Sequence, residues 1–160
     1  MAIHRLTRSE VGALVLGLCI PFAGSWTLAK AGKIRAQKIL EETAAKHSEL
    51  DGLELNATSP NGRGCSTIAS TEAKDLGERC DKEDYSAMRT NKPSVEKEKG
   101  GFDVTLPLHD ANGKVIGVVG MDFKPQPGQV AAGAVAQGKQ IAAGIEKQIP
   151  SKEKLYEPVD

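Results

Sequence analysis

Two strands joined by a turn form the clearest pattern in the chain, at residues 101–124. Apolar residues alternate with polar or small residues over 102–108, which is the period of a strand. Asn112-Gly113 then offers the positive φ angles that a type I′ hairpin turn needs at both central positions. Residues 115–123 are apolar on both alternating sets, so we expect a central strand that is covered on both sides.

Helical spacing marks two longer segments. Residues 32–48 place small and apolar side chains on one face at intervals of three and four, and residues 129–148 do the same. The second helix contains several glycines, each of which disfavours a helix by about 1 kcal/mol relative to alanine. It therefore needs packing or a partner to hold it. Its stripe consists of Val130, Ala134, Gly138, Ile141, Ala142, Ile145 and Ile149.

The residues between the helices predict short strands and one irregular segment. The three strands that precede the hairpin are expected at residues 53–57, 65–70 and 93–97. Residues 71–91 have no long apolar run and are predicted to be a loop with short helices, around 73–76 and 82–89. The order predicts an α+β fold: a five-stranded antiparallel sheet with a long N-terminal helix on one face, and a C-terminal helix. The irregular segment would cover the other face and leave a pocket.

The N-terminal segment is predicted to be a secretory signal peptide. Arg5 and Arg8 give it a basic start, residues 11–29 carry no charge, and Ala29-Lys30-Ala31 is a small-x-small cleavage site. An uncleaved membrane anchor is the alternative, because 19 uncharged residues approach the roughly 20 that span a bilayer. The Ala-x-Ala end favours cleavage, and hence a periplasmic or secreted protein.

Charge gives little indication of a macromolecular partner. The whole chain has 21 basic and 21 acidic residues; without Arg5, Arg8, Lys30 and Glu10 of the signal segment, 18 and 20 remain. The resulting net charge of −2 and the sparse aromatic residues do not favour a nucleic-acid-binding surface.

Two cysteines, Cys65 and Cys80, remain after the predicted cleavage. In an exported chain such a pair indicates a disulfide, which would close a loop of about 16 residues and stabilise the fold by roughly 3 kcal/mol. Two free buried thiols are the alternative. The chain has no Cys-x-x-Cys or His-x-x-x-His spacing, so the sequence predicts no metal site and no cofactor.

Three motifs resemble the extracytoplasmic PAS-like sensors called Cache or PDC domains. Ile68-Ala-Ser-Thr-Glu-Ala-Lys-Asp-Leu-Gly77 resembles the family's "I-A-S-T-x-x-x-D-I-G" segment, and Met88-Arg-Thr-Asn-Lys-Pro93 is similar to its short helix ending in "G-K-P". Residues 105–122 resemble its closing hairpin, "P-x-x-D-x-x-G-x-V-I-G-V-V-G-x-D". The resemblance covers residues 34–124.

The resemblance implies an exported sensor that binds a small carboxylate, amino acid or amine between the sheet and residues 71–92. Members of the family usually lie between two membrane helices, whereas this sequence shows no second apolar span. We therefore expect a free-standing sensor domain without its own output domain. The predicted organisation is a signal peptide at 1–31, a sensor domain at 32–126, an amphipathic helix at 127–149 and a polar tail at 150–160.

Six residues of the expected pocket are candidates for ligand contact. Arg89 lies in the covering segment, where a guanidinium can bind a carboxylate through two parallel hydrogen bonds; a solvated surface arginine is the alternative. Phe102 and Met121 could form an apolar floor, although core packing is the commoner role.

Three polar residues complete the candidate site. Asp103 and Thr105 share a strand face and could hydrogen-bond a ligand, which a solvated strand face explains equally well. Asp122 follows an apolar run and could hold an amine or cap a backbone turn. His47 and His109 are expected to be structural.

Competing functions remain open. Helix 129–148 offers a surface for a homodimer or a membrane receptor partner, so an oligomerising interaction protein without a ligand is one alternative. A thiol-redox protein that uses Cys65 and Cys80 is another. Other enzymes are not supported, because the sequence contains no nucleophile elbow and no phosphate-cradling loop. Gly117 and Gly120 are read instead as small residues that permit close sheet–helix packing.

Overall fold

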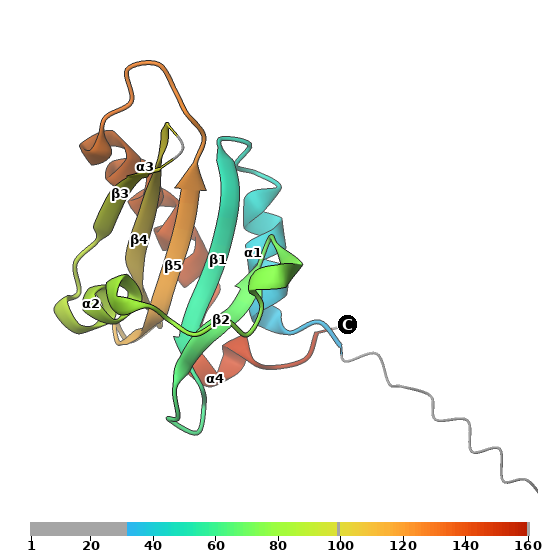
Figure 1. The fold of residues 1–160 in the computed structure, drawn as a ribbon. Helices are drawn as coiled ribbons and strands as arrows, with labels where there is room; N and C mark the ends of the chain where they lie inside the picture. The colour runs from blue at the N-terminus through green and yellow to red at the C-terminus, as the bar shows by residue number, and fades with distance from the viewer. Residues whose placement is uncertain (1–31, 99, 160) are drawn as a thin grey trace, which may run out of the picture. The chain divides into compact units, whose positions relative to one another are not determined.

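Five antiparallel strands form one sheet in the order β2-β1-β5-β4-β3 (Figure 1). The computed structural model describes residues 32–98 and 100–159. Its strands are β1 (Leu50–Thr58), β2 (Cys65–Ser70), β3 (Ser94–Glu98), β4 (Gly101–His109) and β5 (Val115–Phe123). The alternation of the sequence therefore identified every strand, and the hairpin strand β5 is central, as predicted.

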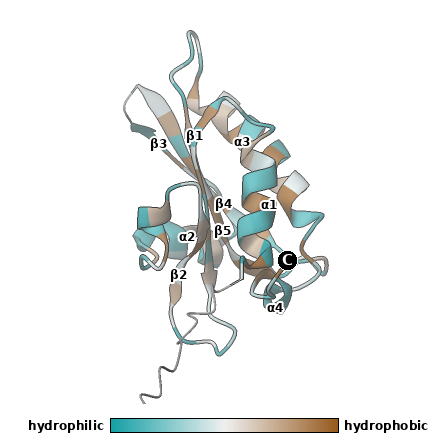
Figure 2. Cartoon of the chain, turned by 90° about the vertical axis from the view of Figure 1, so that its right-hand side faces the viewer, coloured by the Kyte–Doolittle hydropathy of each residue, from teal (hydrophilic) through white to brown (hydrophobic). Residues whose placement is uncertain are grey.

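The helices lie on both sides of this sheet. They are α1 (Arg35–Ala44), the 3₁₀ helix η1 (Ala73–Asp75), α2 (Lys82–Thr90), α3 (Ala131–Glu146) and α4 (Lys152–Leu155). Figure 2 shows the sheet close to edge-on, with α1 and α3 on one side and α2 on the other. The predicted α+β fold, with a five-stranded antiparallel sheet and an N-terminal helix on one face, is confirmed.

The hydrophobic core lies between the sheet and the pair α1 and α3. Strand side chains alternate between the two faces of a sheet, so one set from each strand points into this core. From β1, β4 and β5 these include Leu53, Leu55, Val104, Leu106, Val119 and Met121. Helices α1 and α3 contribute buried Leu40, Ile141 and Ile145.

The small-residue stripe of α3 is part of this core. Ala134, Gly138, Ile141 and Ile145 are buried, and a Cβ on Gly138 would lie 3.1 Å from Leu106 Cδ1. The missing side chain therefore lets the helix approach the sheet closely. The stripe is therefore used inside the molecule, and a homodimer or receptor contact through the rest of helix 129–148 stays a prediction. Val130, at 62% exposure, is the stripe residue that remains at the surface.

The hairpin turn differs from the predicted type I′ turn. Gly113 has a φ of +75°, but Asn112 is not in the positive-φ region. The reason is Asp110, whose Oδ1 accepts hydrogen bonds from the backbone N–H groups of Asn112 at 2.9 Å and Lys114 at 3.1 Å. This side chain stabilises a longer loop in which glycine alone takes the left-handed conformation.

The C-terminal residues fold back onto the domain. The predicted polar tail at 150–160 contains α4, where Leu155 is fully buried, and the Tyr156 hydroxyl donates to the Thr58 carbonyl at 3.1 Å. Ile34 and Pro158 form an isolated β-bridge, which joins the two ends of the described chain. These contacts make the tail a structural part of the domain. Little in the sequence indicates them, because Leu155 is the buried apolar side chain of an otherwise polar stretch.

The predicted signal peptide, residues 1–31, lies outside the described residues. None of the helices within residues 32–159 has the length and apolarity that a membrane span requires.

Gly144→Ala is expected to stabilise the protein by up to about 1 kcal/mol. Gly144 lies inside α3, is exposed, and a Cβ placed on it would meet no atom within 4 Å. Alanine therefore gains helix propensity without a clash. Urea unfolding of the variant checks this, and a loss of stability would contradict the packing of α3 described above.

Candidate functional site

The face of the sheet opposite α1 and α3 carries a concentration of carboxylates. The register places Glu96 of β3 beside Asp103 of β4, and Asp103 beside Asp122 of β5. Like charges directly opposite one another destabilise a sheet. Three acidic residues in one row across adjacent strands therefore oppose the stability of the fold, which makes this row a candidate for a functional role.

Two glycines make room for acidic side chains on this face. A Cβ on Gly52 would overlap the carboxylate of Asp122, and one on Gly120 would lie 2.9 Å from Glu54 Oε1. Both carboxylates thus lie over backbone that has no side chain of its own. This arrangement brings Glu54 of β1 and Asp122 of β5 toward the middle of the sheet.

A cavity of about 290 Å³ lies over this part of the sheet. Strands β1, β4 and β5 form its floor, and Ser70 at the end of β2, together with residues 71–78 that follow, forms one wall. Seven acidic residues and a single basic residue, Lys74, line it, so the cavity favours a positively charged occupant. The acidic residues are Glu54, Glu72, Asp75, Glu78, Glu98, Asp103 and Asp122.

Burial raises the pKa values of the carboxyls on this face. Loss of hydration is the main cause for Asp103, whose pKa rises to about 7, and the negative charges of Asp122 and Glu54 add to it. Burial also raises the pKa of Glu54 and of Asp84 in α2. Asp103 therefore exchanges its proton near neutral pH, which is unusual for an aspartate.

One asparagine connects the acidic face to α2. Asn56 Nδ2 donates to Glu54 Oε1 at 2.9 Å and to Asp84 Oδ2 at 3.2 Å. Asp84 also forms a reciprocal capping box with Asp81, which begins α2. The first turn of α2 is thus fixed against β1 by polar contacts. The buried Asn56 Oδ1 accepts no hydrogen bond from any described residue.

The predicted polar candidates lie on this face. Asp103 and Asp122 line the acidic cavity, as expected for ligand contact. Thr105 lines a neighbouring hollow with Asp103 and Glu96. Phe102 lines another with Asp103 and Asp122, but its side chain packs against the hydrophobic core, the commoner role named for it above. Asp103 is therefore common to all three spaces. The binding role of these residues stays a prediction.

Two predicted candidates are placed elsewhere. Met121 lines the cavity, but only 1% of it is exposed, and its Sδ lies 3.6 Å from the Cβ position of Gly138 in α3. Its side chain therefore packs in the core, which was the commoner role. Arg89 is exposed near the end of α2 and does not line the acidic cavity. The segment that does cover it is η1 and its flanks, not the end of α2.

Sequence reasoning missed Glu54 and the acidic residues of the wall. Glu54 is an alternating position of a predicted strand, which was the available signal. Asp75 and Glu78 belong to a segment without periodicity, so nothing in the sequence indicated which way they point. Cross-strand pairing, which only the sheet order reveals, brings these groups together.

Three carboxylates of the face lie close enough to hold a metal ion. One oxygen each from Glu98, Asp103 and Asp122 lies within 4.8 Å of the others. Oxygen ligands of this kind suit Ca²⁺ or Mg²⁺. The cluster is therefore a reason to compare divalent cations with organic cations in binding experiments.

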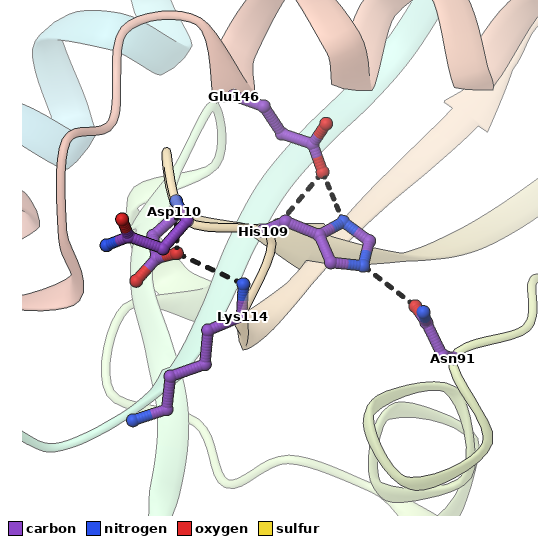
Figure 3. Close-up of polar contacts among 6 residues, drawn as sticks. Asn91, His109, Asp110, Lys114 and Glu146 are labelled. Atoms are coloured by element: carbon purple, nitrogen blue, oxygen red, sulfur yellow. Dashed lines mark hydrogen bonds and ion pairs between the residues drawn. The ribbon is translucent and has the colours of Figure 1, made fainter.

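His109 occupies a second polar cluster, on a different part of the molecule (Figure 3). Its Nδ1 lies 2.6 Å from Glu146 Oε1, its backbone N–H donates to the same oxygen, and its Nε2 lies 2.8 Å from Asn91 Oδ1. One imidazole thus joins β4, α3 and the residue that follows α2. These contacts hold the imidazole in place between the elements, and the structural role expected for His109 stays a prediction.

Cys65 and Cys80 are joined by a disulfide, with Cα atoms 5.3 Å apart. The bond links the start of β2 to the residue before the cap of α2. It closes the loop that contributes the wall of the acidic cavity.

Lowering the pH from 8 to 5.5 is expected to stabilise the protein through Asp103. The pKa of about 7 in the folded state lies above the ordinary aspartate value of 3.8, so the folded state binds the proton more tightly, and stability rises as pH falls below 7. Asp103→Asn should remove this rise and stabilise the protein at pH 8. The expected gain is about 1–2 kcal/mol, because solvent screens the charge of the partly exposed carboxyl and lowers its effect. Urea unfolding at both pH values measures the free energy of unfolding of each variant. Glu42→Gln, on the exposed face of α1, is the control. An equal pH dependence of stability in the wild type and in Asp103→Asn would contradict the prediction.

Comparison with known proteins supports a fold but no family. No protein-family model matches the chain, and no curated protein matches its sequence. Among solved structures, a putative GAF sensor protein from Burkholderia vietnamiensis is 12% identical, with a TM-score of 0.52, over 74% of this chain and 77% of that one.

Two further structures are similar to the same degree. The GAF domain of a two-component sensor histidine kinase from Bacillus halodurans is 15% identical, with a TM-score of 0.51, over 72% of this chain and 96% of that one. The fRMsr of Staphylococcus aureus, in its reduced form, is 13% identical, with a TM-score of 0.52, over 73% and 85%. At these identities the likeness concerns the fold alone, so the expected absence of enzymatic activity stays a prediction.

These matches correct the resemblance to Cache or PDC domains. The three motifs are short, and they lie in strands and a hairpin where any sheet of this kind requires alternating apolar residues and turn formers. They therefore indicated an antiparallel sheet without distinguishing the families that share one. The chain has a GAF-like fold built on a five-stranded antiparallel sheet.

Proposed function

We propose that the protein is a small-molecule-binding sensory domain whose ligand is a small organic cation, such as an amine. The observation that carries the proposal is the lining of the cavity on the sheet, where seven acidic residues meet one lysine. An ammonium group placed there interacts with carboxylates on several sides in a partly desolvated space, where charge interactions are stronger than in water.

The charge of the cavity selects among the three ligand classes expected from the sequence. A carboxylate ligand would be repelled by Asp103, Asp122 and Glu54, whose own mutual repulsion already contributes to the raised pKa of Asp103. An amino acid would bring one favourable and one unfavourable charge. An amine or diamine supplies only the favourable one, and its N–H groups match a lining rich in hydrogen-bond acceptors.

The fold supports a sensory role. The similar structures include a putative GAF sensor protein and a domain of a sensor histidine kinase. The location of the cavity, between a sheet and a polar segment held by few apolar contacts, suits a site whose wall adjusts to a ligand. The proposal includes a partner chain that recognises the ligand-bound state.

We also propose that the domain acts outside the cytoplasm. The signal-peptide pattern of residues 1–31 and the Cys65–Cys80 bond support this location, because disulfides persist mainly in oxidising compartments. Mass spectrometry of protein recovered from the exported fraction of its own cells tests it. A mature chain that begins near Gly32 is expected, and protein found only in the cytosol would contradict it.

A binding screen tests the proposed ligand class. Melting temperature is measured with monoamines, diamines, matched dicarboxylates, Ca²⁺ and Mg²⁺, and calorimetry follows for each hit. A ligand at 100 times its dissociation constant stabilises the folded state by about 2.7 kcal/mol, which raises the melting temperature by several degrees. Shifts with amines and none with dicarboxylates are expected. Shifts with divalent ions alone, or with dicarboxylates alone, would refute the proposal.

A further inference from the structure

The disulfide is placed to control the wall of the acidic cavity. Residues 71–79 lie between Cys65 and Cys80, and we call them the wall segment. Thr71, Glu72, Lys74, Asp75 and Glu78 of this segment line the cavity. The wall segment therefore supplies three of the seven carboxylates that the proposed cation would contact, together with the lysine of the cavity, and the disulfide closes the loop that contains it.

The wall segment has little apolar packing of its own. Helix η1 buries none of its residues, and Leu76, the one large apolar side chain of the segment, is 48% exposed. Segments with few buried apolar contacts open at low free-energy cost, so another constraint has to hold this one in place.

Polar contacts to the sheet supply part of that constraint. The Thr67 N–H donates to the Glu78 carbonyl, and the Gly77 N–H donates to the Thr67 carbonyl, each at 2.9 Å. Ser70 Oγ donates to Asp75 Oδ2 at 3.3 Å, and the Thr71 N–H donates to the Leu53 carbonyl at 3.0 Å. The first two bonds lie on the outer edge of the sheet. The disulfide is the covalent constraint that keeps them in register.

A hollow of about 530 Å³ adjoins the disulfide on the side of Cys65. Its charged lining residues are Arg63 and Arg79, and no carboxylate lines it. Two guanidinium groups attract an anionic molecule and favour thiolate over thiol. Cys65 is the cysteine that lines this hollow, so a thiolate docked there reaches Cys65 Sγ before Cys80 Sγ.

We propose that the Cys65–Cys80 bond is a redox-controlled clasp: a small thiol that carries carboxylates docks between Arg63 and Arg79, reduces the bond and releases the wall segment. Release disperses the carboxylates of the wall and lowers the affinity of the cavity for its cation. The last step rests on the proposed function, whereas docking, reduction and release do not.

The exchange balances with two equivalents of the thiol. The thiolate of the first attacks Cys65 Sγ, forms a mixed disulfide and expels the Cys80 thiolate, which takes up the proton that the thiol released. The thiolate of the second attacks the sulfur of the first, and Cys65 leaves as a thiolate that is protonated in turn. Two electrons pass from the two small thiols to the protein disulfide, and the small thiols leave as their own disulfide.

Release is tested by hydrogen exchange on the oxidised, reduced and Cys65→Ser/Cys80→Ser forms of the domain. Amide exchange in residues 71–79 is expected to be at least tenfold faster in the reduced and double-serine forms, while exchange in β4 and β5 stays unchanged. Unchanged protection of residues 71–79 in both forms overturns the proposal. Loss of protection throughout the sheet also overturns it, because the bond would then hold the whole fold rather than the wall segment.

Docking is tested by the rate of reduction. Glutathione, which carries two carboxylates, is compared with cysteamine, which carries an amine, at equal thiolate concentration. Reduction by glutathione is expected to be at least tenfold faster in the wild type, and Arg63→Gln/Arg79→Gln should abolish that preference. Lys46→Gln, which removes an exposed charge after α1, is the matched control and should keep it. Equal rates for the two thiols in the wild type overturn the docking step.

Coupling to the cavity is tested by the affinity for a diamine in the oxidised and reduced forms. A decrease of at least tenfold on reduction is expected, and an unchanged affinity with an exposed wall segment overturns the coupling. If no diamine binds the oxidised form, the proposed function is refuted, whereas the clasp is still decided by hydrogen exchange and by the reduction rates.

Discussion

Replacement of Glu54 and Asp103 together by glutamine and asparagine is expected to weaken diamine binding at least 100-fold. Both side chains are partly buried on the floor of the acidic cavity. They lie on β1 and β4, the two strands that flank β5. A hydrogen bond to a charged group contributes about 1.5–3 kcal/mol, so the loss of two such contacts exceeds the 2.7 kcal/mol that a 100-fold change requires. Titration calorimetry at pH 8 measures the change.

The fold should tolerate this double substitution. The amides keep the shapes of the acids and remove a mutual repulsion, which predicts a variant at least as stable as the wild type. Glu42→Gln, on the exposed surface of α1, is the matched control and should bind as the wild type does. A double variant that is folded and binds within threefold of the wild type would show that the diamine lies elsewhere.

The same site predicts the direction in which pH acts on binding. Because the pKa of Asp103 is about 7, its carboxyl is largely protonated at pH 5.5 and largely ionised at pH 8. Affinity for a cation should therefore fall as the pH is lowered through 7. Asp103→Asn alone should flatten this dependence over the same interval, and calorimetry at the two pH values compares them.

Gly117→Val is expected to destabilise the protein by about 3–5 kcal/mol, the largest effect on stability that we foresee. A Cβ at this position would overlap the carbonyl oxygen of Asn56 and lie 3.1 Å from Ala57 Cα, both in the backbone of β1. Neither atom moves without breaking the pairing of β1 with β5 at the centre of the sheet. Overpacking and lost hydrogen bonds then add together.

Gly120→Ala is the matched control for this prediction. Its Cβ would approach the flexible side chain of Glu54 at 2.8 Å rather than backbone, so the contact can be relieved by rotation. We expect about 1 kcal/mol or less for Gly120→Ala. Urea unfolding gives both values, and similar losses for the two variants would contradict the close approach of β5 to β1. Gly117 thus has a role within the sheet, and its reading as a sheet–helix packing position is wrong.

Local patterns were sufficient for the secondary structure before α4. The alternation in residues 101–109, the apolar run at 115–123 and the helical spacing of 129–148 depend on neighbours within a few residues, and the structure has elements at each of these places. The cysteine pair was readable for the same reason, since only two of the three cysteines lie outside the predicted signal segment, which leaves few alternatives. The hairpin turn was misjudged because a single side chain, Asp110, selected a longer loop.

What the sequence by itself determined is therefore the five strands, the helices that precede α4, the α+β class and the sulfur pair. Tertiary structure alone decided that the stripe of α3 faces the core, that Met121 packs inside and that Arg89 lies away from the cavity. It also decided that acidic residues from β1, β3, β4 and β5 meet the wall segment on one face. The physical reason is that sheet order and register set which distant side chains become neighbours, and electrostatic function arises from those neighbours rather than from any one residue.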